Sequence, residues 1–307
     1  MPKDVMAIVV TYFPDSVPLR ALVASLLRHV GTVVLVDNTP GESGLVRDLV
    51  EEYANDAHEI RCISFGENKG VASGLNAGIA EALRDGFDYV LLCDQDSLPA
   101  ESMVEALHDV AEHLRAKGCR VGCVSPQYID LITGKIAPFD VHIPGTIFYG
   151  RMAGDSAKPW AEIVMTITSG SLIPCSVFAD VGVMRSDFFI DHVDTEWCHR
   201  VRHHGYSLYG TSEARLDHHL GGGSFKAWSF GWHTYTHYPS NRLYYRFRNF
   251  VRMLWLSHVS KRWKIRQCWY WLGCVYAYTL FSPGRLLNSK MIFRGILDGL
   301  RGRMGPL

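Results

Sequence analysis

Several common sequence signals are missing from this 307-residue chain. Its eight cysteines form no Cys-x-x-Cys pair and several lie in apolar segments, so we expect reduced, mostly buried thiols and a cytosolic protein. The longest apolar stretch, residues 268–281, has 14 residues, whereas a membrane-spanning helix needs about 20. The N-terminus has no basic segment followed by a long apolar one, so we expect no signal peptide.

The usual phosphate-binding and zinc-binding patterns are also absent. No G-x-G-x-x-G follows the first apolar segment, and G-x-x-x-x-G-K-[ST] occurs nowhere in the chain. Two pairs of adjacent histidines, 203–204 and 218–219, lack the spacing of zinc ligands, so we expect no structural zinc. A bound nucleotide would therefore be held by a metal ion and by polar groups at strand ends.

Acidic side chains are nearly absent from the C-terminal part. Residues 242–307 contain 13 Lys and Arg and one acid, Asp298, whereas residues 1–241 contain 18 Lys and Arg against 30 Asp and Glu. Four tryptophans alternate with these cations, a composition typical of a helix in a lipid headgroup layer. We predict that residues 241–307 bind an anionic membrane surface peripherally, and we expect no nucleic acid. The alternative is a helical hairpin packed on the domain or on a second copy of the chain.

The first 125 residues alternate between two periodicities. Apolar segments typical of buried strands occur at 5–13, 32–38, 60–65, 88–93 and 120–126. Helical spacing occurs between them, at 19–30, 43–54, 70–86 and 101–116. Repeated strand–helix units predict a parallel sheet covered by helices on both faces, with a ligand site beyond the carboxyl ends of the strands.

Polar residues follow three of these strands, at Asp37 and Asn38, at Asn68, and at Asp94-Gln95-Asp96. Taken singly, such residues often do no more than form turns. Asp94 and Asp96, however, are two residues apart after an extended strand, so their carboxylates point the same way. Two adjacent carboxylates repel each other unless a cation lies between them. A Mg²⁺ or Mn²⁺ ion shared with phosphate oxygens would meet that need.

Seven segments, taken in order, resemble family 2 GT-A glycosyltransferases, and in particular bacterial rhamnosyltransferases that use dTDP-L-rhamnose. They are IVVTYFPD, VLVDN, ENKGVASGLNAGI, LLCDQDS, TSGSLI, FFIDHVDTEWCHR and LYYRFRNFVRM, and together they span about residues 5–255. The resemblance implies an α/β GT-A fold with a C-terminal helical tail. Residues 1–125 would form the nucleotide-sugar-binding half, 126–240 the acceptor-binding and catalytic half, and 241–307 the tail.

The resemblance also implies roles for individual donor-site residues. Asp37 would accept a hydrogen bond from the N3–H of the pyrimidine, and Asp94 would bind the ribose. Asp96 would be the principal metal ligand, assisted by His218 at the metal or the diphosphate. The other nucleotide-sugar-binding residues would be Thr11, Tyr12, Asn68, Lys69 and Gln95.

Three carboxylates follow the aromatic pair at 188–189, and one of them could deprotonate the acceptor hydroxyl. We expect Asp191 to be the base, with Asp194 next, and His192 stays open because the family often has a carboxylate there. Glu196 has the spacing to pair with Arg200 one helical turn on. The predicted acceptor-binding residues are Ser169, Gly170, Glu196, Trp197, Arg242 and Arg246. The two arginines, together with Arg248, could also reach a diphosphate on the donor or on a lipid-linked acceptor.

The sequence as a whole therefore predicts an inverting, metal-dependent rhamnosyltransferase at the inner face of the cytoplasmic membrane. It would move L-rhamnose from dTDP-β-L-rhamnose to a lipid-linked glycan such as an O-antigen. Two alternatives stay open at this point. The same fold could use another UDP- or GDP-sugar, or the protein could be a non-catalytic scaffold that binds a sugar nucleotide.

Overall fold

The structure is a computed structural model that describes residues 4–41, 43–53, 59–130, 135–146, 148–152, 159–218 and 223–307. For Asp130 and His218 it describes the backbone alone. The first part of the chain contains β1 (Val5–Thr11), α1 (Ser16–Leu27), β2 (Thr32–Asp37), α2 (Gly44–Tyr53), β3 (Glu59–Ser64), α3 (Val71–Asp85), β4 (Tyr89–Asp94), β5 (Leu98–Pro99), α4 (Met103–Ala116) and β6 (Val121–Asp130).

The remaining elements form the second half of the domain and the C-terminal helices. They are β7 (Phe139–His142), β8 (Tyr149–Met152), β9 (Trp160–Ile163), β10 (Ser171–Pro174), α5 (Cys175–Val181), the 3₁₀ turn η1 (Ser186–Phe188), α6 (Val193–His203), β11 (Ser207–His218), β12 (Ser224–Trp228), β13 (Trp232–Thr236), α7 (Ser240–Trp255), α8 (Lys261–Leu280) and α9 (Arg285–Arg301). The predicted alternation of strands and helices up to residue 125 is confirmed.

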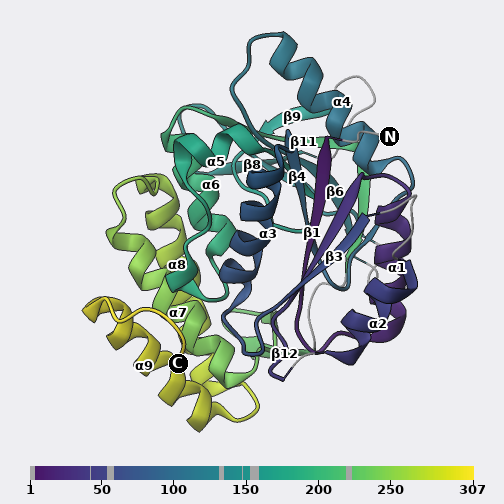
Figure 1. The fold of residues 1–307 in the computed structure, drawn as a ribbon. Helices are drawn as coiled ribbons and strands as arrows, with labels where there is room; N and C mark the ends of the chain where they lie inside the picture. The colour runs from purple at the N-terminus through teal and green to yellow at the C-terminus, as the bar shows by residue number, and fades with distance from the viewer. Residues whose placement is uncertain are drawn as a thin grey trace.

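A mixed nine-stranded sheet forms the centre of the described chain (Figure 1). Its order is β3-β2-β1-β4-β10-β6-β11-β5, with β9 also paired to β11. β1 to β4 are parallel as predicted, but β10 runs antiparallel between β4 and β6, so a purely parallel sheet is wrong. The reversal begins at Gly170, whose N–H donates to the carbonyl of Leu92 (2.7 Å) and turns the chain back along β4. The sheet continues across residue 125, which lies inside β6.

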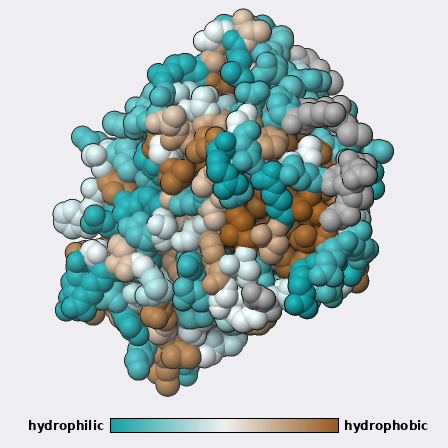
Figure 2. Space-filling model, in the orientation of Figure 1, coloured by the Kyte–Doolittle hydropathy of each residue, from teal (hydrophilic) through white to brown (hydrophobic). Residues whose placement is uncertain are grey.

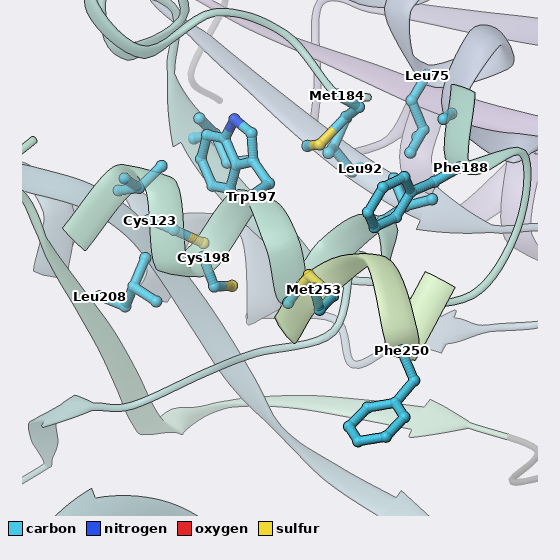
Figure 3. Close-up of a cluster of buried hydrophobic side chains, with 14 of the residues drawn as sticks. Leu75, Leu92, Cys123, Met184, Phe188, Trp197, Cys198, Leu208, Phe250 and Met253 are labelled. Carbon is cyan, nitrogen blue, oxygen red and sulfur yellow. The ribbon is translucent and has the colours of Figure 1, made fainter. Parts of the chain in front are cut away.

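Both faces of the sheet are covered by helices. Alternate residues of β1 point to opposite faces of the sheet. Met6 and Ile8 belong to a buried cluster with α3. Val5, Ala7 and Val9 belong to a second buried cluster with α1 and α4. The cluster on the α3 side also includes α5, α6 and the C-terminal helices, and Figure 3 shows part of it around Trp197. The core therefore joins the tail to the catalytic half of the chain.

The C-terminal helices pack on the domain with one face and expose the other. Trp263 and Trp271 are buried in the core, so these two of the four tail tryptophans pack on the domain, as the alternative reading of the tail expected. Close packing of α9 on α7 requires glycine, since a Cβ on Gly295 would lie 2.4 Å from a carbonyl oxygen of α7. Trp255 and Trp269, by contrast, are 67% and 75% exposed.

An apolar stripe runs along the outer side of α8. We define it by its exposed side chains, which are Ile265, Trp269, Leu272, Tyr276 and Leu280. α9 exposes a second apolar set, which consists of Leu286, Leu287, Phe293, Leu297 and Leu300. Figure 2 shows apolar residues gathered at the lower end of the molecule, where α9 lies in Figure 1. None of the helices described is both long enough and apolar enough to cross a bilayer.

Candidate active site

The ends of β1, β2 and β4 bring the predicted donor-site residues to one edge of the sheet. Thr11 pairs in register with Asp37, and Val10 pairs with Asp94. The Thr11 hydroxyl donates to Asp37 Oδ1 (3.2 Å), so adjacent strand ends are also joined through side chains. The predicted gathering of these residues at the carboxyl ends of the strands is therefore present.

Asp37 is almost fully buried and shapes the loop after β2. Its Oδ1 accepts the N–H of Thr39 (3.0 Å) and its Oδ2 accepts the N–H of Ser43 (2.7 Å). With the bond from Thr11, these make three of the roughly four hydrogen bonds that a carboxylate can accept. Among the described residues, one acceptor position of this carboxylate has no hydrogen-bond donor.

Asn38 connects the end of β2 to the loop before α3, a role that its sequence position alone did not indicate. Its Nδ2 donates to the carbonyl of Gly70 (2.9 Å), and its Oδ1 accepts the N–H of Lys69 (3.0 Å). Asn68 folds back on the same loop and accepts the N–H of Gly70 (3.0 Å). Lys69 is exposed, 3.4 Å from Glu67, so its ammonium faces the open edge.

Gln95, just after β4, forms hydrogen bonds to the backbone at the end of β1. Its Oε1 accepts the N–H of Tyr12 (2.7 Å), and its Nε2 donates to the carbonyl of the same residue (3.2 Å). Both polar ends of the amide are therefore engaged by the backbone. Tyr12, which Gln95 positions, is 46% exposed and has its ring edge-on to Phe13. The structure gives Gln95 a positioning role and leaves the Tyr12 ring available to a ligand.

Asp94 lies in a concentration of negative charge. Burial, with the nearby carboxylates of Asp96 and Asp194, raises the pKa of Asp94 to about 7, and Arg242 opposes this only in part. Asp96 is exposed at the edge. Within the described residues, no three Asp, Glu, His or Cys side chains converge on one point that could hold a metal ion. A cation here would have two protein carboxylates and would need its remaining ligands from a bound molecule.

His218, the second predicted metal ligand, has a side chain outside the described part of the structure. Its backbone ends β11, in register with Asp130 of β6. The structure therefore neither supports nor opposes its predicted role.

Ser169 and Gly170 brace the Asp94–Ser97 turn from beneath. The Ser169 hydroxyl accepts the N–H of Asp94 (3.0 Å) and hydrogen bonds to Ser97 Oγ (2.7 Å), and Ser169 is fully buried. Gly170 has φ of +74°, and a Cβ there would lie 2.7 Å from Pro126. The prediction that these two residues contact the acceptor is wrong, because both are buried beneath the turn.

The loop at 187–192 is held by α7, and this contact was not apparent from the sequence. Asn249 Nδ2 donates to the carbonyls of Phe188, Ile190 and Asp191 at 2.8–2.9 Å. Arg248 is fully buried and donates to Phe188 (3.0 Å), so it is not available to a diphosphate. The loop needs such support because Asp191 has a positive φ of 63°, which is uncommon for a residue with a side chain.

Asp191 is bound by two arginines of α7. Arg242 contacts both carboxylate oxygens (2.9 and 3.2 Å), and Arg246 donates to Oδ1 (3.0 Å). The two guanidinium groups lie over the ring of Tyr238, at 5.1 and 4.2 Å from its centre. The Asp191 side chain is 8% exposed, whereas Arg242 is 43% exposed. Arg242 is thus partly open to solvent, and it interacts electrostatically with Asp94.

Asp194 lies in the first turn of α6 without a cation partner among the described residues. Its Oδ1 accepts the N–H (2.6 Å) and the hydroxyl (3.2 Å) of Thr195. Burial, the largest cause, raises the pKa of Asp194 above its ordinary value. The residue borders a cleft of about 210 Å³ whose other lining residues are Tyr128, Pro138, Phe139, Asp140, Met165, Thr166, Ile167 and Thr195. Asp194 therefore lies between this cleft and Asp94.

Three neighbours of Asp194 are structural. Glu196 is fully buried, with Arg200 at 2.9 Å and His258 at 2.8 Å, so the predicted i,i+4 pair is confirmed and the predicted acceptor contact is wrong. Trp197 is 2% exposed and donates its indole N–H to Gly182, which contradicts its predicted acceptor contact too. Burial lowers the pKa of His192 to about 4, and its ring packs against Trp263 and Trp271, so His192 is a neutral core residue.

Polar and acidic side chains thus gather at the carboxyl edge of the sheet, where open α/β folds bind their ligands. Residues 7–180 match the family model described as Glycosyl transferase family 2, so the chain belongs to this glycosyltransferase family. The sheet with its helices is a GT-A-like fold, as the resemblance implied.

Known proteins agree with this assignment. The chain is 28% identical to dTDP-rhamnosyl transferase RfbF of Shigella flexneri over 305 residues, which is 99% of this chain and 98% of the relative. A solved structure of GalNAc-T7 with UDP, GalNAc and Mn²⁺ superposes over 70% of this chain with a TM-score of 0.55 at 12% identity. TarS of S. aureus superposes over 96% of this chain with a TM-score of 0.51 at 12% identity. This chain spans 43% of the length of either structure, and the likeness concerns the fold.

We predict that Asp94→Asn stabilises the metal-free protein at high pH. Because the pKa of Asp94 is raised in the folded state, its ionisation disfavours folding, and this cost grows from about pH 4 to pH 7 and is constant above. Asp94→Asn removes it, which should stabilise the fold by on the order of 2 kcal/mol at pH 8 and by less at pH 5.

Thermal unfolding midpoints with a chelator present, at pH 5, 6, 7 and 8, would measure this effect. Asp109→Asn, at an exposed position of α4, is the matched control and should change nothing at any pH. An equal gain for Asp94→Asn at all four pH values would contradict the raised pKa.

Proposed function

We propose that the protein is a rhamnosyltransferase that uses dTDP-β-L-rhamnose as donor. The full-length relative that carries this activity in its name supports the donor sugar. The site supports the nucleotide, since buried Asp37 keeps an acceptor position for the N3–H of thymine, and exposed Tyr12 can cover the base. Lys69 and Asn68 would border the nucleotide from the neighbouring loop.

The donor diphosphate would bind between Asp96 and Arg242 with Mg²⁺ or Mn²⁺. The observation that favours a cation is the site of Asp94, whose pKa is raised first by burial and then by the nearby carboxylates of Asp96 and Asp194. Two carboxylates and diphosphate oxygens form a ligand set that suits either ion. When bound, the ion would neutralise charge on the leaving diphosphate. Arg242, which is partly open to solvent, can hold the same diphosphate from the other side.

We further propose that Asp194 is the general base and that Asp191 is a positioning residue. Asp191 has both oxygens occupied by Arg242 and Arg246, which leaves it poorly suited to accept a proton. Asp194 has a raised pKa, no cation partner among the described residues, and a place on the cleft wall. A single displacement by the deprotonated hydroxyl would invert the anomeric centre and give an α-linked rhamnoside.

The acceptor would enter through the cleft beside Asp194, carried by a membrane lipid. The tail supports this location, because it exposes the apolar stripe of α8 and contains one acid against 13 cations. Within this proposal, residues 1–125 bind the donor, residues 126–240 form the acceptor side, and residues 241–307 dock on the cytoplasmic face of the membrane. Lipid-linked glycans of the O-antigen type fit such an arrangement.

Donor choice is tested by calorimetry with dTDP, UDP, GDP and dTDP-rhamnose, with and without Mg²⁺. We expect tighter binding of the thymidine and uridine ligands with metal, the tightest for dTDP-rhamnose. Asp96→Ala should remove the metal-dependent part, whereas Asp109→Ala on α4 should not. Equal affinity for GDP would contradict the role of Asp37, and affinity independent of metal would contradict the role of Asp96.

The base is tested by turnover of dTDP-rhamnose with membrane extracts as the acceptor source. Asp194→Asn should lower kcat by about 10²–10⁴-fold with unchanged donor affinity, because it removes proton abstraction alone. Wild-type kcat should fall as pH decreases through the raised pKa of Asp194. Asp191→Asn should loosen the loop and weaken donor binding as well. If Asp191→Asn retains donor affinity and loses turnover while Asp194→Asn remains active, the two roles are reversed.

The anomeric configuration of the product, measured by NMR, tests inversion.

Membrane docking is tested by flotation with vesicles that contain phosphatidylglycerol. The double variant Trp269→Glu/Leu272→Glu places two charges in the apolar stripe. It should weaken vesicle binding at least about tenfold, because burial of each apolar side chain in the membrane contributes about 2 kcal/mol to binding. Leu83→Glu, at an exposed site on α3, is the control and should bind as wild type does. Equal flotation of the two variants would show that the stripe does not contact lipid.

A further inference from the structure

A cluster of arginines lies beside the acceptor cleft, outside the site described above. Arg202 of α6 and Arg262 of α8 approach the imidazole of His142 from opposite ring nitrogens, with N···N distances of 2.7 and 3.1 Å. Arg266, one turn further along α8, lies over the ring of Tyr149 at 4.6 Å. Tyr149 stands directly opposite His142 in the β7–β8 pair. Two helices and one hairpin, distant in sequence, thus bring three guanidinium groups together.

This cluster has more hydrogen-bond donors than acceptors. A neutral imidazole has one acceptor nitrogen, so it can satisfy one of the two arginines, and a protonated imidazole can satisfy neither. Burial and the two arginines lower the pKa of His142, which keeps the ring neutral. The Tyr149 hydroxyl is buried and has no hydrogen-bond partner in the described structure. The arrangement therefore has N–H and O–H groups that an added anion would satisfy.

Nearby carboxylates do not neutralise the cluster. Asp140 reaches Arg266 at 4.0 Å, and Glu162 acts on His142 only at longer range. No carboxylate of the described residues lies within ion-pair distance of Arg202 or Arg262. Two of the three guanidinium groups consequently lack a counter-charge, and the planar fork of each suits phosphate oxygens.

The cluster lies between the acceptor cleft and the apolar stripe. Asp140 lines the cleft, and His142 follows two residues later on the same face of β7, about 7 Å away. On α8, Arg262 and Arg266 flank the stripe that begins at Ile265, because residues three and four apart are neighbours on a helix surface. A ligand that spans these features in order has a sugar in the cleft, an anion at the arginines, and an apolar chain along α8.

We propose that Arg202 and Arg262, with the Tyr149 hydroxyl, bind a phosphate or diphosphate that joins the acceptor glycan to its lipid. This proposal rests on the proposed function and defines its acceptor as a lipid-phosphate-linked sugar. The anion would fix the distance between the lipid and the sugar hydroxyl presented to Asp194. A neutral glycolipid would lack this anchor and would bind more weakly.

The test is calorimetric binding of geranyl diphosphate to the full chain, with saturating dTDP and Mg²⁺ to fill the donor site and geraniol as the neutral ligand. Wild type should bind geranyl diphosphate and not geraniol. Arg202→Gln/Arg262→Gln should weaken binding at least about tenfold, because charge-assisted bonds are lost. Arg262→Lys, which keeps the charge and loses the fork, should fall between them. Lys261→Gln, exposed on the same helix, should match wild type.

A second experiment distinguishes specific binding of a lipid-linked phosphate from general binding to anionic headgroups. The same variants are floated with phosphatidylglycerol vesicles, where the proposal expects Arg202→Gln/Arg262→Gln to bind as wild type does. An equal loss on these vesicles, or equal affinity of the double variant and wild type for geranyl diphosphate, would overturn the proposal. The single variants Arg202→Gln and Arg262→Gln make the same test if the double variant is unstable. No sugar transfer is measured, so failure of the rhamnosyl activity and failure of this site give different results.

Discussion

The contact between α7 and the loop at 187–192 is the interaction on which the candidate active site depends. Arg242 and Arg246 neutralise Asp191, and Asn249 binds three carbonyls of the loop, so a segment with unfavourable backbone angles is held in one conformation. α6 begins directly after this loop and carries Asp194. The C-terminal helices are therefore part of the candidate active site, because α7 binds the loop that leads directly into α6.

The carboxylates at the sheet edge show a different use of charge. Asp191 is neutralised within the protein, whereas Asp94 lies near Asp96 and Asp194 with only partial compensation from Arg242 among the described residues. Burial, together with these two carboxylates, raises the pKa of Asp94, and this disfavours the folded state at neutral pH. A site that is unfavourable when empty and satisfied by a cation and a diphosphate fits an enzyme whose donor brings both. Ser169, Gln95 and Asn38 maintain this arrangement by hydrogen bonding to the backbone.

The faces of α8 lie in different surroundings, which the composition of the tail could not reveal. One side of α8 places Trp263 and Trp271 in the core, and the opposite side exposes Trp269 in the apolar stripe. Arg262 and Arg266 lie at the border between the stripe and the β7–β8 hairpin. The same helix thus completes the domain, provides a surface suited to lipid, and contributes to an arginine cluster next to the cleft. These roles are compatible because a helix has distinct faces.

Local periodicity was enough to predict the alternation of strands and helices to residue 125 and to locate Asp37, Asp94 and Asp96 at strand ends, because both are properties of short segments. The i,i+4 pair of Glu196 and Arg200 followed for the same reason. Three features became visible only in the folded chain. β10 enters antiparallel, Glu196, Trp197 and Ser169 are buried, and Asp191 is paired with arginines more than fifty residues away. Burial and long-range ion pairs depend on which segments meet in space, and residue spacing along the chain carries no record of that.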